Sequence, residues 1–164
     1  METFIEVQRE NIKELAQLAD NIWHEYWGII LTPEQIDYMI EKFQSEKAIN
    51  EQYNNENYTY YFINQNGKNI GYFGISKKKN YLFLSKLYIS KGFRSKGIGR
   101  RAFEKIKEIS LQNGYNEIRL TVNKYNQNTI YAYLKWGFKT IDAVVTDIGS
   151  GFVMDDYIMS WNRQ

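Results

Sequence analysis

Residues 86–101 read KLYISKGFRSKGIGRR, and this segment decides the fold. An apolar strand ends near Ser90, and a basic loop containing glycines follows it and opens a helix. The first N–H groups of a helix have no partner within it, and the helix dipole is positive there. Glycines let the main chain approach an anion closely, and lysine and arginine add positive charge. The segment therefore predicts a cradle for a phosphate or pyrophosphate.

Three kinds of phosphate cradle can be compared with this segment. A nucleotide-binding P-loop needs Gly-Lys-Ser/Thr at its end, whereas two arginines follow Gly99. A dinucleotide fingerprint matches formally from Gly97 to Ala102, but seven residues separate it from the strand. Asn123 also stands where that fingerprint expects an acidic residue. The third kind is a cradle for an acyl-CoA.

The chain before this segment alternates between strand and helix patterns. Apolar periodicity predicts a short strand at 3–7, a helix from Asn11 that stops at Gly28, and a second helix from Thr32. Thr32 is expected to cap that helix, with Gln35 able to close a capping box. A polar stretch at 45–57 predicts a short helix that fades into a loop. Asn66-Gly67 predicts a tight hairpin between strands 58–65 and 69–77.

The chain around and after the segment continues the alternation. The pattern predicts a strand at 81–90, a helix at 97–113 capped by Gly114, a strand at 117–122, a helix at 129–136, and strands at 138–147 and 152–161. The strand, helix and strand at 81–122 form a βαβ unit, so its two strands are expected to be parallel and adjacent. The whole chain predicts a mixed sheet with helices on both faces.

Length and composition limit the class of protein. The 164 residues fit a single domain spanning residues 1–164. The chain has no cysteine and one histidine, His24, which excludes a disulfide scaffold, a thiolate zinc site and a histidine-rich metal site, so no metal is expected. Without a signal-peptide pattern or a long apolar run, the sequence predicts a cytoplasmic protein without membrane contact. A net charge of +2 is too small to argue for a nucleic-acid partner.

Two motifs at matching spacing make the acyl-CoA cradle specific. Arg94-Ser95-Lys96-Gly97-Ile98-Gly99 resembles the Arg/Gln-x-x-Gly-x-Gly/Ala signature of the GNAT superfamily, N-acetyltransferases that use acetyl-CoA. Residues 126–138, NQNTIYAYLKWGF, resemble that family's motif Asn-x-x-Ala-x-x-x-Tyr-x-x-x-Gly-Phe, with Thr129 in place of the alanine. The resemblance covers about residues 58–161, and the N-terminal helices in outline. It implies an α+β sandwich, with a mixed, mostly antiparallel sheet of about seven strands, helices on both faces and a central parallel βαβ unit.

The resemblance also implies a donor site for acetyl-CoA. In the family the strand before the loop splays from its neighbour, and its free main-chain groups bind the acetyl and pantetheine end. Backbone N–H groups of the loop hold the pyrophosphate, and amides of the following helix hold the pantetheine arm. The implied residues are Leu87, Tyr88 and Ile89 in the strand, Arg94, Ser95, Lys96, Gly97, Ile98, Gly99 and Arg100 in the loop, Asn126 and Asn128 for the arm, and Lys135 for a phosphate.

Catalysis needs a proton donor and a proton acceptor. Tyr133 holds the position of the family's general acid, which protonates the departing CoA thiolate. A phenol with a pKa of about 10 stays protonated at neutral pH and can donate. A base must accept the proton of the attacking amine, and Glu25 is our first candidate, with the Asp155-Asp156 pair as the alternative. Adjacent strand residues face opposite sides, so only one aspartate of the pair is expected to face the cleft.

These residues predict acetyl transfer from acetyl-CoA to a primary amine by direct attack in a ternary complex. The acceptor is expected to be a small amine, a polyamine or a peptide amino group, because carboxylates beside aromatic rings suit an ammonium group. Such residues occur in the helix pair at 11–44 and in the C-terminal strands. They are Glu25, Asp37, Glu41, Asp155 and Asp156, beside Trp23, Tyr26, Trp27 and Tyr38.

Two other functions compete with the enzyme. One is a non-catalytic regulatory module that binds CoA or a nucleotide, and Tyr133 argues against it because a pure binder would not need that residue. The other is a nucleic-acid-binding protein that uses the basic side chains of the loop and the following helix, which the phosphates of acetyl-CoA explain more simply. We therefore expect a small amine as partner, no nucleic acid and no membrane, and the sequence leaves a homodimer open.

Overall fold

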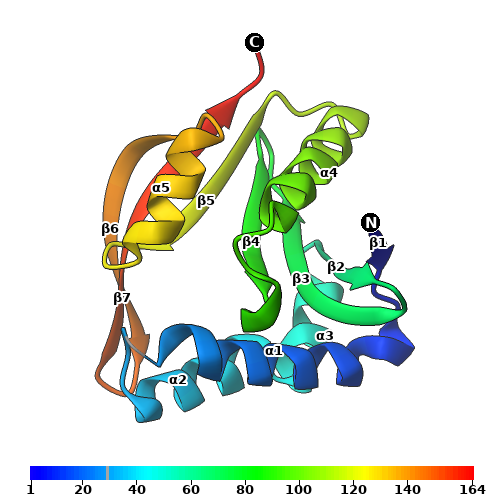
Figure 1. Ribbon diagram of the computed structural model, residues 1–164. Coiled ribbons are helices and arrows are strands. Elements are labelled where there is room, and N and C mark those ends of the chain that lie inside the picture. Colours follow the sequence, from blue (N-terminus) through cyan, green and yellow to red (C-terminus); the bar gives the residue numbers. More distant parts are fainter. Residues whose placement is uncertain (29) are drawn as a thin grey trace.

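The computed structural model describes residues 1–28 and 30–164, which form a seven-stranded sheet with helices on both faces (Figure 1). The strands lie in the order β1-β2-β3-β4-β5-β7-β6, and the mixed, mostly antiparallel sheet predicted from the sequence is confirmed. The strands are β1 (Glu2–Glu6), β2 (Tyr58–Gln65), β3 (Lys68–Lys77), β4 (Leu82–Ile89), β5 (Glu117–Asn123), β6 (Lys139–Gly149) and β7 (Phe152–Asn162). The helices are α1 (Ile12–Trp27), α2 (Pro33–Met39), α3 (Glu46–Asn55), α4 (Ile98–Gln112) and α5 (Gln127–Lys135), with short helical turns η1 (Arg9–Asn11), η2 (Ile40–Gln44) and η3 (Lys91–Phe93).

The strands β4 and β5 run parallel, as the βαβ pattern predicted, but they pair over a short distance. Residues Leu82–Leu84 of β4 pair with Ile118–Leu120 of β5. Beyond Leu84 the two strands diverge towards α1, which crosses the open end (Figure 1). We call this divergence the fork. It leaves the main chain of β4 without a strand partner on the β5 side from Ser85 onwards.

A β-bulge at Ser85 shifts the alternation of side chains along β4. Two consecutive residues of β3 pair with Leu84 and Lys86, so Ser85 is skipped in the ladder. Leu84 and Leu87 consequently pack on the same face of the sheet, under α4, although strict alternation would put them on opposite faces. Lys86 and Tyr88 are turned to the other face, towards α1.

Two hydrophobic cores cover the two faces of the sheet. On one face, α4 and α5 bury residues such as Phe103 against strand residues such as Ile118. On the other face, α1, α2 and α3 bury Leu15 against Tyr72. α3 fills ten residues of the polar stretch for which the sequence predicted only a short helix. In the part of the chain that the structure describes, no helix is long and apolar enough to cross a membrane.

Local sequence signals set the ends of several elements. Asn66 and Gly67 have φ values of 53° and 80°, the type I′ turn geometry, so the predicted hairpin is confirmed. Thr32 Oγ1 accepts a hydrogen bond from the Gln35 N–H at 3.2 Å, which confirms Thr32 as the cap of α2. The predicted capping box is wrong, because the Gln35 side chain donates instead to the Val153 carbonyl at 3.1 Å and ties α2 to β7.

An ion pair between Glu2 and Arg101 joins the edge strand β1 to α4. Nε and Nη2 of Arg101 donate to the two carboxylate oxygens of Glu2 at 2.7 and 2.6 Å. These hydrogen bonds hold the pKa of Glu2 at about 2, well below its usual range. Because Arg101 lies in the first turn of α4, the pair fixes the start of that helix and the loop that leads into it.

We expect Glu2→Gln to lower the melting temperature at neutral pH, because the variant loses this charge-assisted pair. A carboxylate with a depressed folded pKa stabilises the fold fully above its unfolded pKa of 4.5 and loses that contribution as the pH falls to about 2. The difference in melting temperature between parent and variant should therefore shrink over that range. Circular dichroism melts from pH 7 to pH 2 measure it, and a difference that is constant with pH would contradict the assignment.

Candidate active site

Two adjoining cavities lie at the fork. The inner cavity, of about 240 Å³, is enclosed by the fork, α1 and α2. The outer groove, of about 910 Å³, runs along the starts of α4 and α5. Both are lined by Tyr26, Leu87, Asn126, Thr129 and Tyr133. A molecule in the outer groove and another in the inner cavity would therefore meet at these five residues.

The loop before α4 forms one wall of the outer groove. Ser95 and Gly97 have left-handed φ values of 63° and 79°, and such turns arrange backbone N–H groups around an anion-binding concavity. The N–H groups of residues 98–100 have no acceptor within the helix, and the first intrahelical bond runs from the Arg101 N–H to the Gly97 carbonyl at 3.1 Å. A Cβ atom at Gly97 would lie 2.9 Å from Arg101 Nη1, so a side chain there would disturb both the loop and the pair between Arg101 and Glu2.

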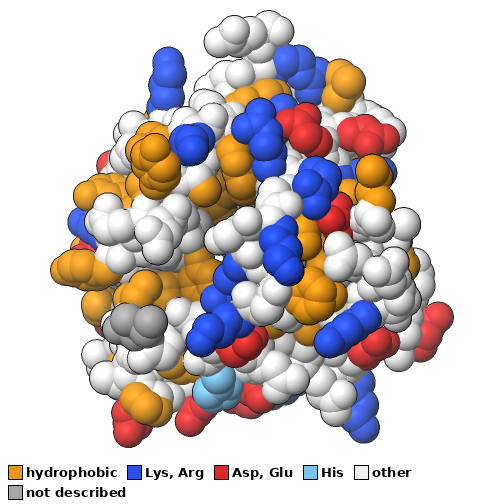
Figure 2. All heavy atoms as spheres, in the orientation of Figure 1, with side chains coloured by type: hydrophobic (Ala, Val, Ile, Leu, Met, Phe, Trp, Pro, Cys, Tyr) orange, Lys and Arg blue, Asp and Glu red, His pale blue; other side chains and the backbone are white. Residues whose placement is uncertain are grey.

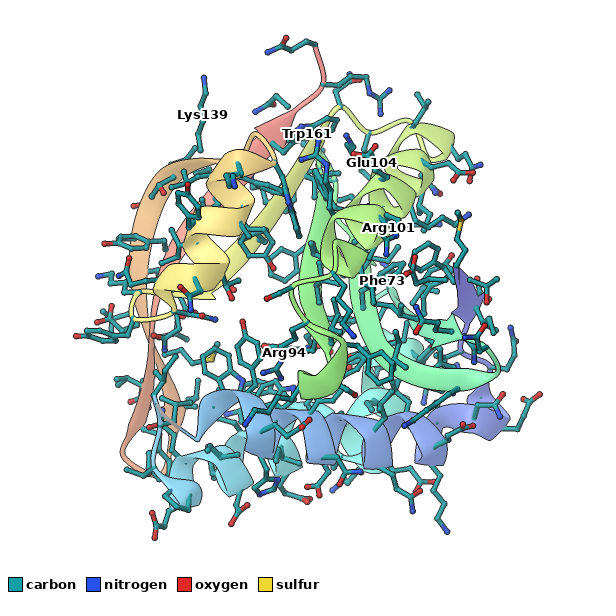
Figure 3. The ribbon with its side chains drawn as sticks, viewed as in Figure 1. Phe73, Arg94, Arg101, Glu104, Lys139 and Trp161 are labelled. Atoms are coloured by element: carbon teal, nitrogen blue, oxygen red, sulfur yellow. The ribbon has the colours of Figure 1, made fainter. Side chains whose placement is uncertain are left out.

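Arg94 lies at the open end of the fork, above α1 (Figure 3). Its Nε donates to the Ile89 carbonyl at 2.8 Å, and its guanidinium lies 4.9 Å from the centroid of the Tyr26 ring. Its buried Nη2 has no hydrogen-bond partner among the described residues. Figure 2 shows Lys and Arg side chains gathered on this face of the molecule. An anionic group in the outer groove would satisfy the free donor of Arg94.

Tyr26, in the last turn of α1, spans the fork to α5. Its hydroxyl accepts from Asn126 Nδ2 at 2.9 Å and also hydrogen-bonds with Thr129 Oγ1. Its ring packs edge-on against Tyr88, with 5.2 Å between the centroids. Sequence reasoning placed Tyr26 only among the aromatic residues of an acceptor cleft. Its bridging role depends on Asn126, 100 residues further along the chain, and no local sequence pattern predicts such a contact.

Tyr133 lies where the outer groove and the inner cavity meet. Its side chain is 7% exposed and packs edge-on against Trp136 and Phe138. Burial, with a smaller effect from Tyr26, raises the pKa of Tyr133 well above its usual range. The phenol is therefore protonated at any physiological pH and can donate a proton to a group at the junction.

Asp156, on β7, is a carboxylate in the wall of the inner cavity. It is 5% exposed, and burial together with the charge of Asp155 raises its pKa to about 6, against a smaller opposing effect of Lys124. Asp155 instead pairs with Lys124, with 2.9 Å between Oδ1 and Nζ. As expected for adjacent strand residues, only one of the two aspartates lines the inner cavity.

Lys86, on β4, is a second charged side chain in the inner cavity, and sequence reasoning missed it. Its Nζ donates to Ser85 Oγ at 2.8 Å and lies 5.1 Å from the centroid of the Tyr58 ring. Burial lowers the pKa of Lys86 to about 7, although the charge of Glu56 opposes the shift. Regular alternation counted from Leu84 would place Lys86 under α4, whereas the bulge at Ser85 turns it towards the inner cavity. The sequence pattern therefore does not predict its position.

Residues 15–138, which include the loop before α4 and Tyr133, match the profile of the Acetyltransferase (GNAT) family. The chain belongs to this family. Several solved structures share its fold. The PaiA N-acetyltransferase from Thermoplasma acidophilum, solved in complex with coenzyme A, is 22% identical with a TM-score of 0.82, and the match covers 99% of each chain.

Two further GNAT structures show the same likeness. A GNAT-family acetyltransferase from Staphylococcus aureus Mu50 is 21% identical, with a TM-score of 0.74 and 100% coverage of both chains. A GNAT-family acetyltransferase from Elizabethkingia anophelis, solved with acetyl-CoA bound, is 15% identical, with a TM-score of 0.60, and the match covers 72% of this chain and 83% of that one. At these identities the likeness shows the shared GNAT fold.

Most residues implied for the GNAT donor site line the outer groove. Tyr88 lines the inner cavity instead, and Lys96 lines neither space. Across residues 1–28 and 30–164, no three His, Asp or Glu side chains are grouped so that they could hold a metal ion. The predicted residues that line the outer groove are Leu87, Ile89, Arg94, Ser95, Gly97, Ile98, Gly99, Arg100, Asn126, Asn128, Tyr133 and Lys135.

The acidic wall expected on the acceptor side of this GNAT fold is not formed. Glu25 is exposed and lines neither the inner cavity nor the outer groove, because α1 turns Trp23 and Trp27 inwards and Glu25 outwards. Asp37 is exposed and bonds with His24 Nε2 at 2.9 Å. Glu41 and Asp155 also lie outside the inner cavity, so Asp156 alone of these carboxylates lines it.

We expect the carboxyl group of Asp156 to titrate near pH 6 in the ligand-free GNAT protein, which carbon-13 NMR measures, with Asp156→Asn to assign the resonance. Asp155→Asn should lower this pKa, because it removes a like charge, and Lys124→Met should raise it, because it removes an opposite charge. If the carboxyl titrates near its ordinary value of 3.8 in the parent, in Asp155→Asn and in Lys124→Met, the cavity does not shield it from water.

Proposed function

We propose that residues 1–164 act as one N-acetyltransferase domain, which transfers the acetyl group of acetyl-CoA to a primary amine in a ternary complex. The observation that carries this proposal is the meeting of the outer groove and the inner cavity at Tyr133. Two spaces that share a proton donor can hold two substrates with their reacting atoms in contact. Family membership supports acetyl transfer, and the related structures with coenzyme A and acetyl-CoA support acetyl-CoA as the donor.

Acetyl-CoA would occupy the outer groove. Its pyrophosphate would bind the N–H groups of Arg94–Arg100, where the free Nη2 of Arg94 adds a donor. The pantetheine arm would follow the edge of β4, which has no β5 partner beyond Leu84, and Asn126 would bind one of its amides. The thioester would then reach Leu87 at the junction, where a main-chain N–H stabilises the negative charge that develops on the carbonyl oxygen.

The amine would attack the thioester from the inner cavity. A new C–N bond forms at the acetyl carbon, and the C–S bond to CoA breaks. Asp156, with a pKa of about 6, is ionised at neutral pH and accepts the proton that the amine loses. Tyr133 gives its proton to the departing thiolate. Asp156 thus replaces Glu25 in the role of base, because Glu25 does not reach either space.

The alternative function, a regulatory module that binds CoA without catalysis, predicts a different experimental result. A protein that only binds CoA uses the outer groove and has no use for Asp156 in the inner cavity. Release of free thiol from acetyl-CoA with a panel of primary amines separates the two functions. We expect amine-dependent thiol release, and tight acetyl-CoA binding without any turnover would favour the module.

We expect Gly97→Val to abolish acetyl-CoA binding measured by calorimetry. Gly97 has a φ of 79°, which valine rarely adopts, and a Cβ there would lie 2.9 Å from Arg101 Nη1. Gly92→Val is the matched control in the same loop, since a Cβ at Gly92 meets no atom within 4 Å. If Gly97→Val binds acetyl-CoA with unchanged affinity, the loop before α4 does not hold the pyrophosphate.

We expect Tyr133→Phe to lower kcat by about 10²–10⁴ while the affinity for acetyl-CoA stays within a few-fold, since the ring remains and only the proton donor is lost. Steady-state kinetics and calorimetry measure the two quantities. Tyr81→Phe serves as control, because Tyr81 lies outside the inner cavity and the outer groove. A Tyr133→Phe variant that turns over at the parent rate would make Tyr133 a packing residue.

A further inference from the structure

Lys86 is a cation inside the inner cavity that the proposed reaction does not use. It forms no ion pair with any residue in 1–28 or 30–164. Its pKa falls to about 7 because burial outweighs the charge of Glu56. Lys86 is half-buried among aromatic rings, and an anion bound beside its Nζ would stabilise the charged form.

The surrounding residues hold Lys86 in place without neutralising it. Its Nζ lies 5.1 and 5.9 Å from the ring centroids of Tyr58 and Tyr60 and donates to Ser85 Oγ. Tyr60 fills the space over Gly74, where a Cβ would lie 2.7 Å from the ring. An ammonium group has three N–H donors and Ser85 takes one, so two are left for a ligand.

The inner cavity carries one charge of each sign. Among its described lining residues, Asp156 is the one carboxylate and Lys86 the one cation. They come from β7 and β4, the two neighbours of β5. Asp156 lies on the face of β7 opposite to Tyr157, and Lys86 extends towards Tyr58 on β2, so the two charges stand at opposite ends of the cavity. The indole and phenol rings of Trp23, Trp27 and Tyr58 form much of the remaining wall. The complementary ligand is an amine that also bears an anionic group.

We infer that the acetyl acceptor is an amine that bears a carboxylate several bonds away, such as the side-chain amine of lysine, an ω-amino acid or a short peptide. Its carboxylate pairs with Lys86 while its amine lies beside Asp156. This inference rests on the proposed function, because it assigns the substrate of that reaction. A diamine or polyamine, which the acidic residues of the sequence suggested, would bring a second ammonium group towards Lys86, and like charges repel.

Matched pairs of amines test the inference, since the members of each pair differ only by a carboxylate. Suitable pairs are lysine with 1,5-diaminopentane and 6-aminohexanoate with pentylamine. Alanine with ethylamine is the short control pair, in which the carboxylate sits next to the amine. We expect the carboxylate to raise kcat/KM by about ten-fold or more in at least one pair, the effect of one charge-assisted hydrogen bond.

Two variants assign that preference to Lys86. Lys86→Met keeps the length of the side chain and removes the charge, so the ratio of kcat/KM within the preferred pair should fall about ten-fold. The exposed Lys139, on β6, lies outside the inner cavity and the outer groove (Figure 3), and Lys139→Met should leave the ratio unchanged. Lys86→Met should melt at or above the parent temperature, because it removes an unpaired charge from the interior.

The outcomes distinguish this inference from the proposed function. Equal turnover of both members of every pair, or a preference that survives Lys86→Met, overturns the inference and leaves amine acetylation standing. Thiol release with none of the amines overturns the proposed function. In that case, calorimetry in the presence of CoA, which has no acetyl group to donate, measures binding of the amines and still decides the inference. Carboxylate-dependent binding that Lys86→Met abolishes supports it, and its absence contradicts it.

Discussion

Three residue pairs hold β4 to β5, and the whole site depends on the pairing ending there. A longer parallel ladder would use up the main-chain groups of β4 beyond Leu84 and close the space below it. Because the ladder stops, the sheet opens without losing its core, which α4 and α5 complete on one face and α1 on the other. Tyr26 then reaches across the opening to Asn126, so the halves of the sheet stay connected at the point where they separate.

The features that the sequence predicted are those fixed by short-range backbone chemistry. The turn at Asn66-Gly67 needs two residues with positive φ, and the loop before α4 needs Gly97 for the same reason. A single crossover helix between two consecutive strands then indicates that β4 and β5 are parallel neighbours. Each of these constraints acts within a few residues or follows from the order of the elements along the chain. It can therefore be predicted from the sequence without knowledge of the tertiary packing.

The charged residues of the inner cavity follow from side-chain direction, which the sequence does not show. Glu25 lies between the inward-facing Trp23 and Trp27, and the helical periodicity of α1 places it on the exposed side of that helix. Lys86 is displaced by a bulge whose position depends on the pairing of β3 with β4. Counting carboxylates therefore predicted an acidic wall, whereas the folded chain lines the inner cavity with one charge of each sign.

The bulge at Ser85 also makes the chemistry of the inner cavity sensitive to the register between β3 and β4. Upstream of it, Leu82 and Leu84 face α4, and downstream of it the odd-numbered residues do so. If Ser85 entered the ladder and the bulge were lost, Leu87 would turn into the cavity and Lys86 out of it, while the loop that follows kept its sequence. Gradual substitution alters such a wall one group at a time, whereas loss of the bulge exchanges a polar wall for an apolar one. New acceptor preferences could therefore arise abruptly during the divergence of such proteins, with the handling of the acetyl donor inherited intact.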